Sequence, residues 1–326
     1  MSQPFYHLRP NKYVDRRLFL NAIDRIGQLF DLKKHRYVGF GSYLFDDFKL
    51  FHDRLQIDNM ISLESDIDNF KRAEYNVPYN CITVFNQSST DFISNGEWGE
   101  YNNIIWLDYT SPRKLSQQFS DVASLSNLLL PHDILRVTLN ANAGTLGDLG
   151  KNGEDVSIGL QKRMDKFKTR MGDYVVSDMR EEDFKTDNYP ILVLKCLRAL
   201  ICNSFIETKM DKRFFVPLFS TVYQDGEHRM LTFTGVVLDD HDEHARLEAL
   251  MQDVSFVNMK WDEPSYIKIP ELTVKEMLTI NRMLPGEGAK EQINSELGFV
   301  FGNNLEEIES YISFYKYYPS FQSVSF

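Results

Sequence analysis

Residues 37–64 read YVGFGSYLFDDFKLFHDRLQIDNMISLE, and their pattern is the strongest signal of the fold in this chain. An apolar strand begins at Tyr37, and Gly39 and Gly41 allow a tight turn at its end. The spacing of apolar residues in LFDDFKLF predicts a helix, and MISLE predicts a second strand that ends in Glu64. This order is typical of a nucleotide-binding βαβ unit, in which the glycines let a ligand approach the backbone and a carboxylate about 20 residues later binds the ribose hydroxyls.

The chain continues with further strands and helices in alternation. Apolar runs predict strands over 81–85, 102–108 and 133–141, and helical patterns predict helices over 67–75 and 113–129. Strands that are apolar on both faces are typical of a parallel sheet covered by helices. The pattern therefore predicts an open doubly wound α/β sheet, whose ligands bind beyond the carboxyl ends of its strands.

The second half of the chain adds a hairpin and two helical parts. The β runs 213–223 and 229–238 flank an Asp-Gly pair, which is a strong hairpin signal. We expect a Rossmann-like, doubly wound seven-stranded sheet that ends in this antiparallel hairpin, within a domain over residues 1–262. A helical insertion is expected at about 143–212, and a C-terminal helical extension at 263–326.

Composition and charge narrow the classes of function. The 326 residues are 43% hydrophobic and 25% charged, as in ordinary globular proteins. The formal net charge of −11 weighs against non-specific nucleic-acid binding, which depends on lysine and arginine. A basic helix over 162–170 leaves a nucleic-acid or nucleotide partner open, although a solvated helix face is the simpler interpretation. Without a signal peptide or an apolar run near the roughly 18 residues of a membrane span, we expect a cytoplasmic protein.

Metal ligands are sparse in recognisable patterns. Cys81, Cys196 and Cys202 lie in apolar runs and form no CxxC pair, so we expect buried thiols in a reducing compartment. His241 and His244 have HxxH spacing, but the surrounding acidic residues are typical of a helix start after a strand. The sequence therefore predicts no metal site.

Parallel strands followed by an antiparallel hairpin resemble the class I methyltransferases, which use S-adenosylmethionine (SAM). The first glycine turn of that family holds the methionine part of the cofactor. The matching residues here are Gly39, Phe40, Gly41 and Ser42. The resemblance also implies that Glu64 is the ribose ligand and that Ser88 contacts the cofactor on its adenine side.

The resemblance extends to the edge of the sheet where the methyl group would react. Asp108 matches the residue at the end of strand four that borders the methyl group, and Tyr109 follows it. Both are expected to face the acceptor, with Asp108 as an orienting group or general base. Asn140 ends the next strand on the expected substrate side. Arg9 and Lys12 precede the first helix, where they could reach the cofactor carboxylate or an anionic substrate.

The whole chain resembles a bacterial family of putative O-methyltransferases through YHLRPNK, VDRRLF, FDDF, ISLE and WLDYT. This resemblance implies direct in-line methyl transfer from SAM to an acceptor, most simply an oxygen. Two alternatives stay open. The glycine turn keeps two of the usual three glycines, which favours a ligand-binding subunit of a bacterial complex, for example in defence. LDYTSP resembles the DPFGSP motif of some tRNA guanine methyltransferases, which leaves RNA or nucleotide methylation open. The aromatic tail could be core cover or the interface of a homo- or hetero-oligomer.

Overall fold

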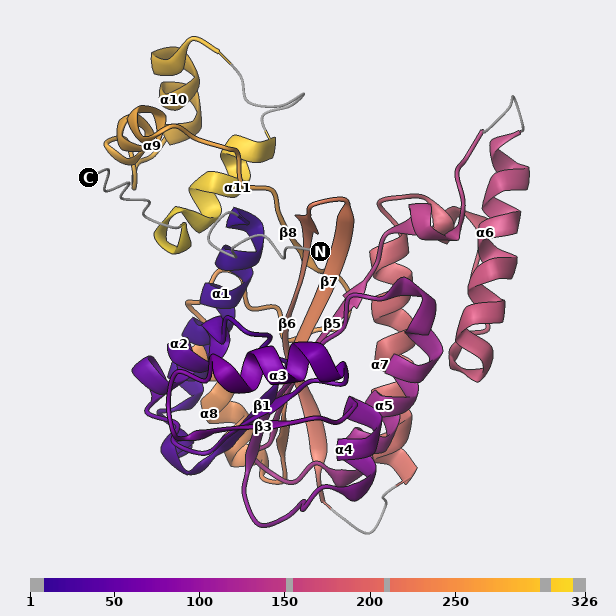
Figure 1. Ribbon diagram of the computed structural model, residues 1–326. Helices are drawn as coiled ribbons and strands as arrows, with labels where there is room; N and C mark the ends of the chain where they lie inside the picture. Colours follow the sequence, from indigo (N-terminus) through magenta and orange to yellow (C-terminus); the bar gives the residue numbers. More distant parts are fainter. Residues whose placement is uncertain (1–8, 151–154, 208–211, 300–305, 319–326) are drawn as a thin grey trace.

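The computed structural model describes residues 9–150, 155–207, 212–299 and 306–318. The first residues of the YHLRPNK motif and parts of the expected C-terminal extension lie outside these ranges. Figure 1 shows a central sheet between layers of helices, with a group of C-terminal helices beside the first helix.

An eight-stranded mixed sheet forms the centre, in the order β3-β2-β1-β4-β5-β7-β6-β8. The strands are β1 (Arg36–Gly39), β2 (Met60–Leu63), β3 (Ile82–Phe85), β4 (Asn103–Asp108), β5 (Ile134–Asn140), β6 (Phe214–Asp225), β7 (His228–Leu238) and β8 (Ser265–Ile267). The first five are mutually parallel, and β7 lies antiparallel between β5 and β6. This arrangement confirms the Rossmann-like sheet with its terminal hairpin.

The eighth strand was not expected from the sequence. It is β8, which pairs parallel to β6 through Thr221 and Ser265. A segment of three residues is too short to show a strand period, so it does not stand out in the sequence. The division into a domain over 1–262 and an extension over 263–326 stays a prediction, and β8 joins the two parts through backbone pairing.

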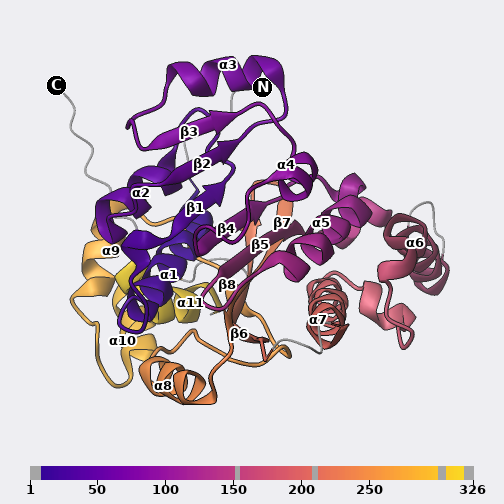
Figure 2. The same cartoon turned by 90° about the horizontal axis from the view of Figure 1, so that it is seen from below.

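Helices cover both faces of the sheet (Figure 2). One face carries α1 (Pro10–Ile26), α2 (Asp46–Leu55) and α8 (His241–Met251), with α3 (Ile67–Tyr75) at the β3 edge. The other face carries α4 (Ser89–Asn95), α5 (Leu115–Leu128) and α7 (Tyr189–Glu207), and α6 (Val156–Met171) lies on the outer side of this layer. The C-terminal helices α9 (Val274–Asn281), α10 (Ala289–Leu297) and α11 (Glu306–Phe314) share the apolar core of α1.

The alternation along β4 assigns side chains to the two cores. Ile104 and Trp106 pack in the core under α1, whereas Ile105 and Leu107 pack in the core under α5 and α7. Since the side-chain period of a strand is two, Asp108 continues the α1 side. This alternation therefore places Asp108 and the next residue, Tyr109, on different faces of the sheet.

A buried ion pair attaches α1 to the sheet. Asp15 on α1 and Arg136 on β5 are both fully buried, with Oδ2 and Nη2 2.5 Å apart. Thr221 on β6 donates a hydrogen bond to the other carboxylate oxygen, and the Arg136 guanidinium lies over the Trp106 ring. A buried carboxylate needs partners of this kind, because an unpaired charge in the core is very costly.

Two further sequence expectations concern α7 and the cysteines. Although α7 is long and mostly apolar, no helix in the described ranges has the length and hydrophobicity needed to cross a bilayer.

All three cysteines are free. Cys196 is buried as expected, but Cys81 and Cys202 are only partly buried, so the expectation of three buried thiols is wrong for those two. An apolar run does not by itself show which of its positions reach the surface.

Candidate functional site

A pocket opens where the parallel strands end. Its volume is about 320 Å³, and its lining comes from the β1 turn, the end of β2, the start of α4 and the end of β4. Ligand pockets commonly measure about 300–1,000 Å³, so this one is at the small end of the range. It brings together five residues that the sequence analysis predicted: Phe40, Glu64, Ser88, Asp108 and Tyr109.

The glycine turn shapes the pocket mainly through Phe40. The other three predicted turn residues, Gly39, Gly41 and Ser42, are absent from the lining. A Cβ atom on Gly41 would lie 2.8 Å from the Ser62 hydroxyl and from two phenylalanine rings. The Gly41 N–H donates to the same Ser62 hydroxyl at 3.1 Å, and Ser42 has φ +51°. In this structure, glycine at position 41 is therefore required by packing within the turn.

Glu64 and Ser88 form one wall of the pocket at the ends of neighbouring strands. The Oε1 atom of Glu64 accepts a hydrogen bond from the Asp66 N–H at 3.0 Å, and its backbone carbonyl accepts from the Asn86 side chain. Ser88 caps α4, where its hydroxyl oxygen accepts from the Asp91 N–H. These bonds fix both residues, and among the described residues no donor contacts Oε2 of Glu64.

Another part of the lining contains a polar network centred on Asp121, which the sequence analysis did not predict. Asp121 is buried on α5, and its two carboxylate oxygens accept hydrogen bonds from Tyr109, Ser89, Thr90 and the side chain of Gln117. The Tyr109 hydroxyl donates to Asp121 at 2.6 Å. Burial, followed by the nearby charge of Asp121, raises the pKa of Tyr109 well above its usual value. Tyr109 is therefore a neutral donor that fixes this wall.

This network changes the position expected for Tyr109. Consecutive strand residues point to opposite faces, so the Tyr109 ring turns toward α5 while Asp108 turns toward α1. The Tyr109 ring packs edge-on against Phe40, with ring centres 5.6 Å apart. Its hydroxyl is already bonded to Asp121, so Tyr109 forms part of the pocket wall, and contact with an acceptor stays a prediction.

Asp108 is paired with a residue from the first turn of α1. The Lys12 ammonium group donates to Oδ2 of Asp108 at 3.0 Å, and the Arg9 guanidinium donates to Asp225 on β6 at 2.9 Å. The structure thus places both predicted anion-binding residues at the sheet edge, in contact with carboxylates of the protein itself. Whether they also contact a ligand stays a prediction.

Three buried oxygens on the α1 side lack hydrogen-bond partners among the described residues. They are Oδ1 of Asp108, the Tyr223 hydroxyl and Oδ1 of Asp225. Burial raises the pKa of Tyr223, and the charges of Asp15 and Asp108 add to this effect. A buried polar atom without a partner costs about 1–3 kcal/mol, so a polar ligand or a water next to any of these atoms would be stabilised.

Asn140 has a role in holding the strand ends together. Its side-chain nitrogen donates to the Thr110 carbonyl and lies 3.2 Å from Nδ1 of His228. Its side-chain oxygen accepts from the Asn142 N–H. Asn140 therefore connects the loop after β4 with the β6–β7 hairpin, and direct contact with a substrate stays a prediction.

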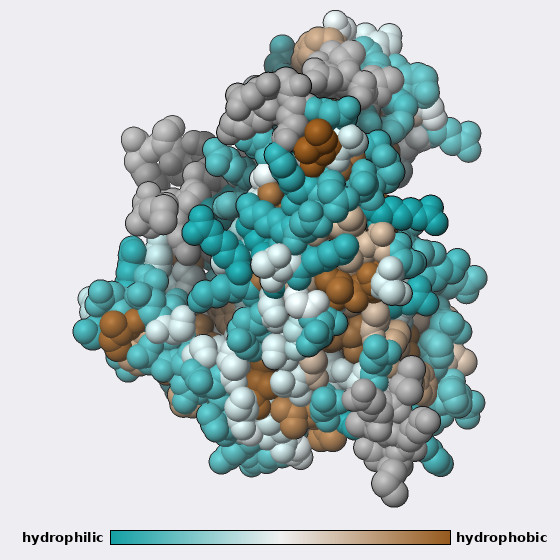
Figure 3. Space-filling model, turned by 90° about the vertical axis from the view of Figure 1, so that its right-hand side faces the viewer, coloured by the Kyte–Doolittle hydropathy of each residue, from teal (hydrophilic) through white to brown (hydrophobic). Residues whose placement is uncertain are grey.

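The basic helix predicted over 162–170 lies within α6, on the face seen in Figure 3. That face is mainly hydrophilic, with small groups of hydrophobic side chains among the polar ones. Arg163 is buried and donates to the carbonyls of Gly147 and Phe184, and Arg170 donates to the Thr145 carbonyl. These two arginines therefore connect loops of the insertion, while Lys166 and Lys168 are exposed.

The HxxH pair does not form a candidate metal site. The His241 ring stacks on Phe214 with ring centres 5.0 Å apart, and His244 meets the same ring edge-on. Neither histidine belongs to a metal-type group of His, Cys, Asp and Glu among the described residues. The sequence interpretation of this segment as an acidic helix start fits α8, where Asp240 caps the helix.

Comparison with known proteins places the chain in a family. A family model described as Putative O-methyltransferase matches residues 4–326. The chain belongs to this family. No curated protein matches it.

Several solved methyltransferase structures resemble the chain at low similarity. The N-methyltransferase NodS from Bradyrhizobium japonicum WM9 shares 8% identity over 70% of this chain and 98% of its own, with a TM-score of 0.38. A putative O-methyltransferase from Klebsiella pneumoniae shares 13% identity over 73% and 91%, with a TM-score of 0.37. A putative S-adenosylmethionine dependent methyltransferase from Listeria monocytogenes shares 8% identity over 65% and 95%, with a TM-score of 0.38.

Family membership implies SAM as the cofactor, and the pocket residues fit that molecule. Glu64 offers a carboxylate to ribose hydroxyls, and Phe40 with Tyr109 offers aromatic surface to a flat base. The buried Oδ1 of Asp108, which has no hydrogen-bond partner in the described part of the chain, lies at the same edge and suits a cationic or hydrogen-bond-donating group. The pocket's chemistry therefore agrees with the family of O-methyltransferase-like proteins.

Proposed function

We propose that this protein is a SAM-dependent methyltransferase that transfers a methyl group directly to an oxygen acceptor. The observation that carries the proposal is the convergence of Phe40, Glu64, Ser88 and Asp108 on one pocket at the carboxyl ends of parallel strands. These residues come from four different segments of the chain. When bound, the cofactor supplies an electrophilic methyl group on its sulfonium centre.

Different side chains around the end of β4 would bind the cofactor and activate the acceptor. Glu64 would hold the ribose, and Phe40, Tyr109 and Ser88 would bound the base. Asp108 would orient the acceptor hydroxyl and take its proton on Oδ1, the oxygen without a partner among the described residues. Lys12 donates to the other oxygen of Asp108 and so fixes the direction of the carboxylate.

A second candidate is a ligand-binding subunit without turnover, as the sequence analysis also allowed. The Lys12–Asp108 pair favours it, because Lys12 is 3% exposed and already occupies one oxygen of the proposed base. In that case the pocket would bind SAM or S-adenosylhomocysteine (SAH) and the protein would catalyse no transfer.

Calorimetry with SAM and SAH tests the pocket. We expect binding to the wild type and at least a tenfold weaker affinity for Glu64→Ala, because the ribose loses its carboxylate. Glu74→Ala is the matched control, since Glu74 is exposed on α3. The absence of heat with either ligand, or equal affinities for the two variants, would contradict the cofactor site.

Formation of SAH in the presence of pooled hydroxyl-bearing metabolites tests the chemistry. Asp108→Asn keeps the shape of the side chain and removes its charge, so we expect transfer to fall by at least a hundredfold while SAH still binds. Binding without any transfer by the wild type would support the non-catalytic candidate instead.

A further inference from the structure

A second group of chemically reactive side chains lies at the other end of the strands from the pocket, where β2 and β3 begin. His52 is in the last turn of α2, Asp58 precedes β2, and Cys81 precedes β3. The two strands have four residues each, so the group is separated from the strand ends at the pocket by roughly 13 Å. The methyl-transfer proposal therefore makes no use of these residues.

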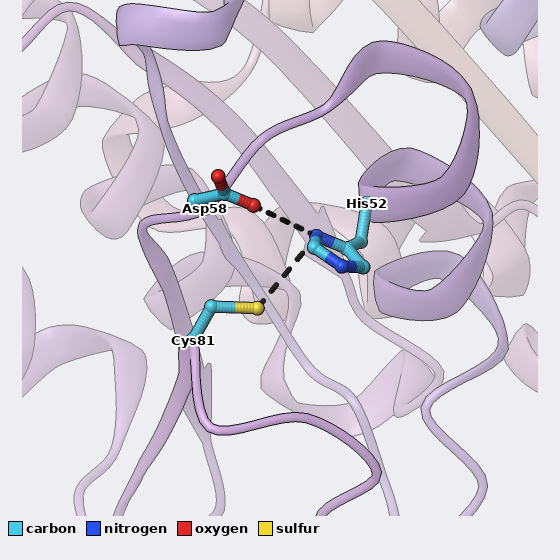
Figure 4. A group of neighbouring side chains, drawn as sticks. All are labelled: His52, Asp58 and Cys81. Atoms are coloured by element: carbon cyan, nitrogen blue, oxygen red, sulfur yellow. Dashed lines mark hydrogen bonds and ion pairs between the residues drawn. The ribbon is translucent and has the colours of Figure 1, made fainter.

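Figure 4 shows that the Asp58 and Cys81 side chains point to the same edge of the His52 ring. Nδ1 of His52 lies 3.0 Å from Oδ1 of Asp58 and 3.7 Å from Sγ of Cys81. The Ile57 carbonyl oxygen lies 3.1 Å from the same nitrogen. Four electron-rich atoms from three separate segments thus surround one point in space.

This arrangement does not suit a proton relay. In a catalytic triad the two ring nitrogens of histidine face different partners, so that the ring can accept a proton on one side while the other side is held. Here the carboxylate and the thiol both approach Nδ1. A single N–H at that position can serve only one of its neighbours well, whereas a cation there would satisfy all of them.

Two of the separations are close to the edges of a tetrahedral metal site. With Zn–N and Zn–O bonds of about 2.1 Å and a Zn–S bond of about 2.3 Å, tetrahedral angles place N and O about 3.4 Å apart and N and S about 3.6 Å apart. The observed values are 3.0 Å and 3.7 Å, and the three ligand atoms all lie within 4.8 Å of one another. The Asp58 side chain is 74% exposed, so an ion can reach the group from solvent.

We propose that His52, Asp58 and Cys81 bind a divalent cation of the zinc type, with the Ile57 carbonyl or a water in the fourth position. Imidazole and thiolate ligands favour Zn²⁺ over Mg²⁺ or Ca²⁺. Binding releases the thiol proton of Cys81 to solvent and leaves the thiolate on the metal. The ion would join the end of α2 to the starts of β2 and β3, and so act in structure and not in methyl transfer.

Cobalt substitution of the full-length, metal-stripped protein tests the site. We expect one Co²⁺ per chain, with the thiolate-to-cobalt charge-transfer band and the intense visible bands of tetrahedral cobalt, and displacement of both by Zn²⁺. Cys81→Ser should lose the charge-transfer band, whereas Cys202→Ser, the control at a second partly buried thiol, should keep it. A cobalt spectrum without a thiolate band, or equal spectra from the two variants, overturns the proposal.

Zinc titration gives an independent readout that needs no enzyme activity. We expect at least a tenfold weaker affinity for Cys81→Ser and His52→Gln, and a melting temperature that zinc raises in the wild type but not in Cys81→Ser. His132→Gln controls for the group of His132, Asp239 and Glu243, which has no thiol. Affinities for zinc that are unchanged in Cys81→Ser and His52→Gln would overturn the assignment. Since Cys81→Ser should bind SAH like the wild type, failure here is distinct from failure of the proposed function.

Discussion

The ammonium group of Lys12 lies 3.0 Å from Oδ2 of Asp108, although 96 residues separate them in the chain. The pair joins the first turn of α1 to the carboxyl end of β4. It therefore connects a helix that covers one face of the sheet with the carboxylate proposed to act on the acceptor.

Removing the Lys12 charge should destabilise the fold. Lys12→Met keeps the length of the side chain but leaves the mostly buried carboxylate of Asp108 without its cation. We expect a loss of about 3 kcal/mol in the free energy of unfolding. Urea denaturation measures it. Lys34→Met is the control, because Lys34 pairs with Asp31 at the surface and should change stability by less than about 0.5 kcal/mol. Equal losses in the two variants would refute the importance of the Lys12 pair.

The buried pair of Asp15 and Arg136 should show strong coupling. Arg136→Met leaves a fully buried carboxylate without its partner, so we expect a loss of about 3–5 kcal/mol. The double variant Arg136→Met with Asp15→Leu should recover most of that loss, because an apolar pair needs no desolvation of charge. A double-mutant cycle in urea checks this, and additive single losses would contradict the coupling.

The Tyr109–Asp121 hydrogen bond should support both stability and ligand binding. Tyr109→Phe removes one donor from the buried carboxylate, and we expect a loss of about 1.5 kcal/mol in stability together with weaker SAH binding. Tyr75→Phe, at a 90% exposed position, should leave both unchanged. Calorimetry and urea denaturation of the same samples separate the two effects. An SAH affinity of Tyr109→Phe equal to that of the wild type would show that this hydrogen bond does not support ligand binding.

Asp133 should make stability depend on pH in a defined window. It is fully buried, and burial raises its pKa to about 6, above the value of about 3.9 in unfolded chains. The native state therefore binds the proton of Asp133 more tightly than the unfolded chain does. The stability that protonated Asp133 contributes is fully present below about pH 4 and is lost as the pH rises through 6. Between pH 7 and pH 4, the free energy of unfolding of the wild type should therefore rise by about 2–3 kcal/mol relative to that of Asp133→Asn.

Urea denaturation of both proteins at pH 7, 5 and 4 measures this difference and cancels the contributions of other carboxylates. Asp31→Asn serves as the control, because Asp31 is exposed and its pKa is lowered by Lys34, so it should show no gain at acid pH. A wild-type advantage that stays constant with pH would show that Asp133 does not titrate in this window.

Local patterns were enough to predict most of the sheet and part of the pocket. The period of apolar residues depends on neighbours along the chain, so α3 over residues 67–75 and the hairpin strands were expected from sequence. The helix α4 was not expected, since its seven residues span fewer than two turns and give little helical period, and α10 was not expected either. Phe40, Glu64, Ser88 and Asp108 follow strands or the glycine turn, and parallel strands bring such positions to one edge.

From the amino-acid sequence we could predict the first seven strands along the chain, the sheet edge that forms the pocket, and the resemblance to O-methyltransferases. Tertiary structure alone decided which partner each polar group meets. Lys12 meets Asp108, Tyr109 meets Asp121, and His52 meets Cys81, across separations of 96, 12 and 29 residues. No local pattern encodes these pairs, because they depend on how α1, α5 and the strand starts pack against the sheet. The packing turned Tyr109 away from Asp108 and gathered potential metal ligands that share no sequence motif.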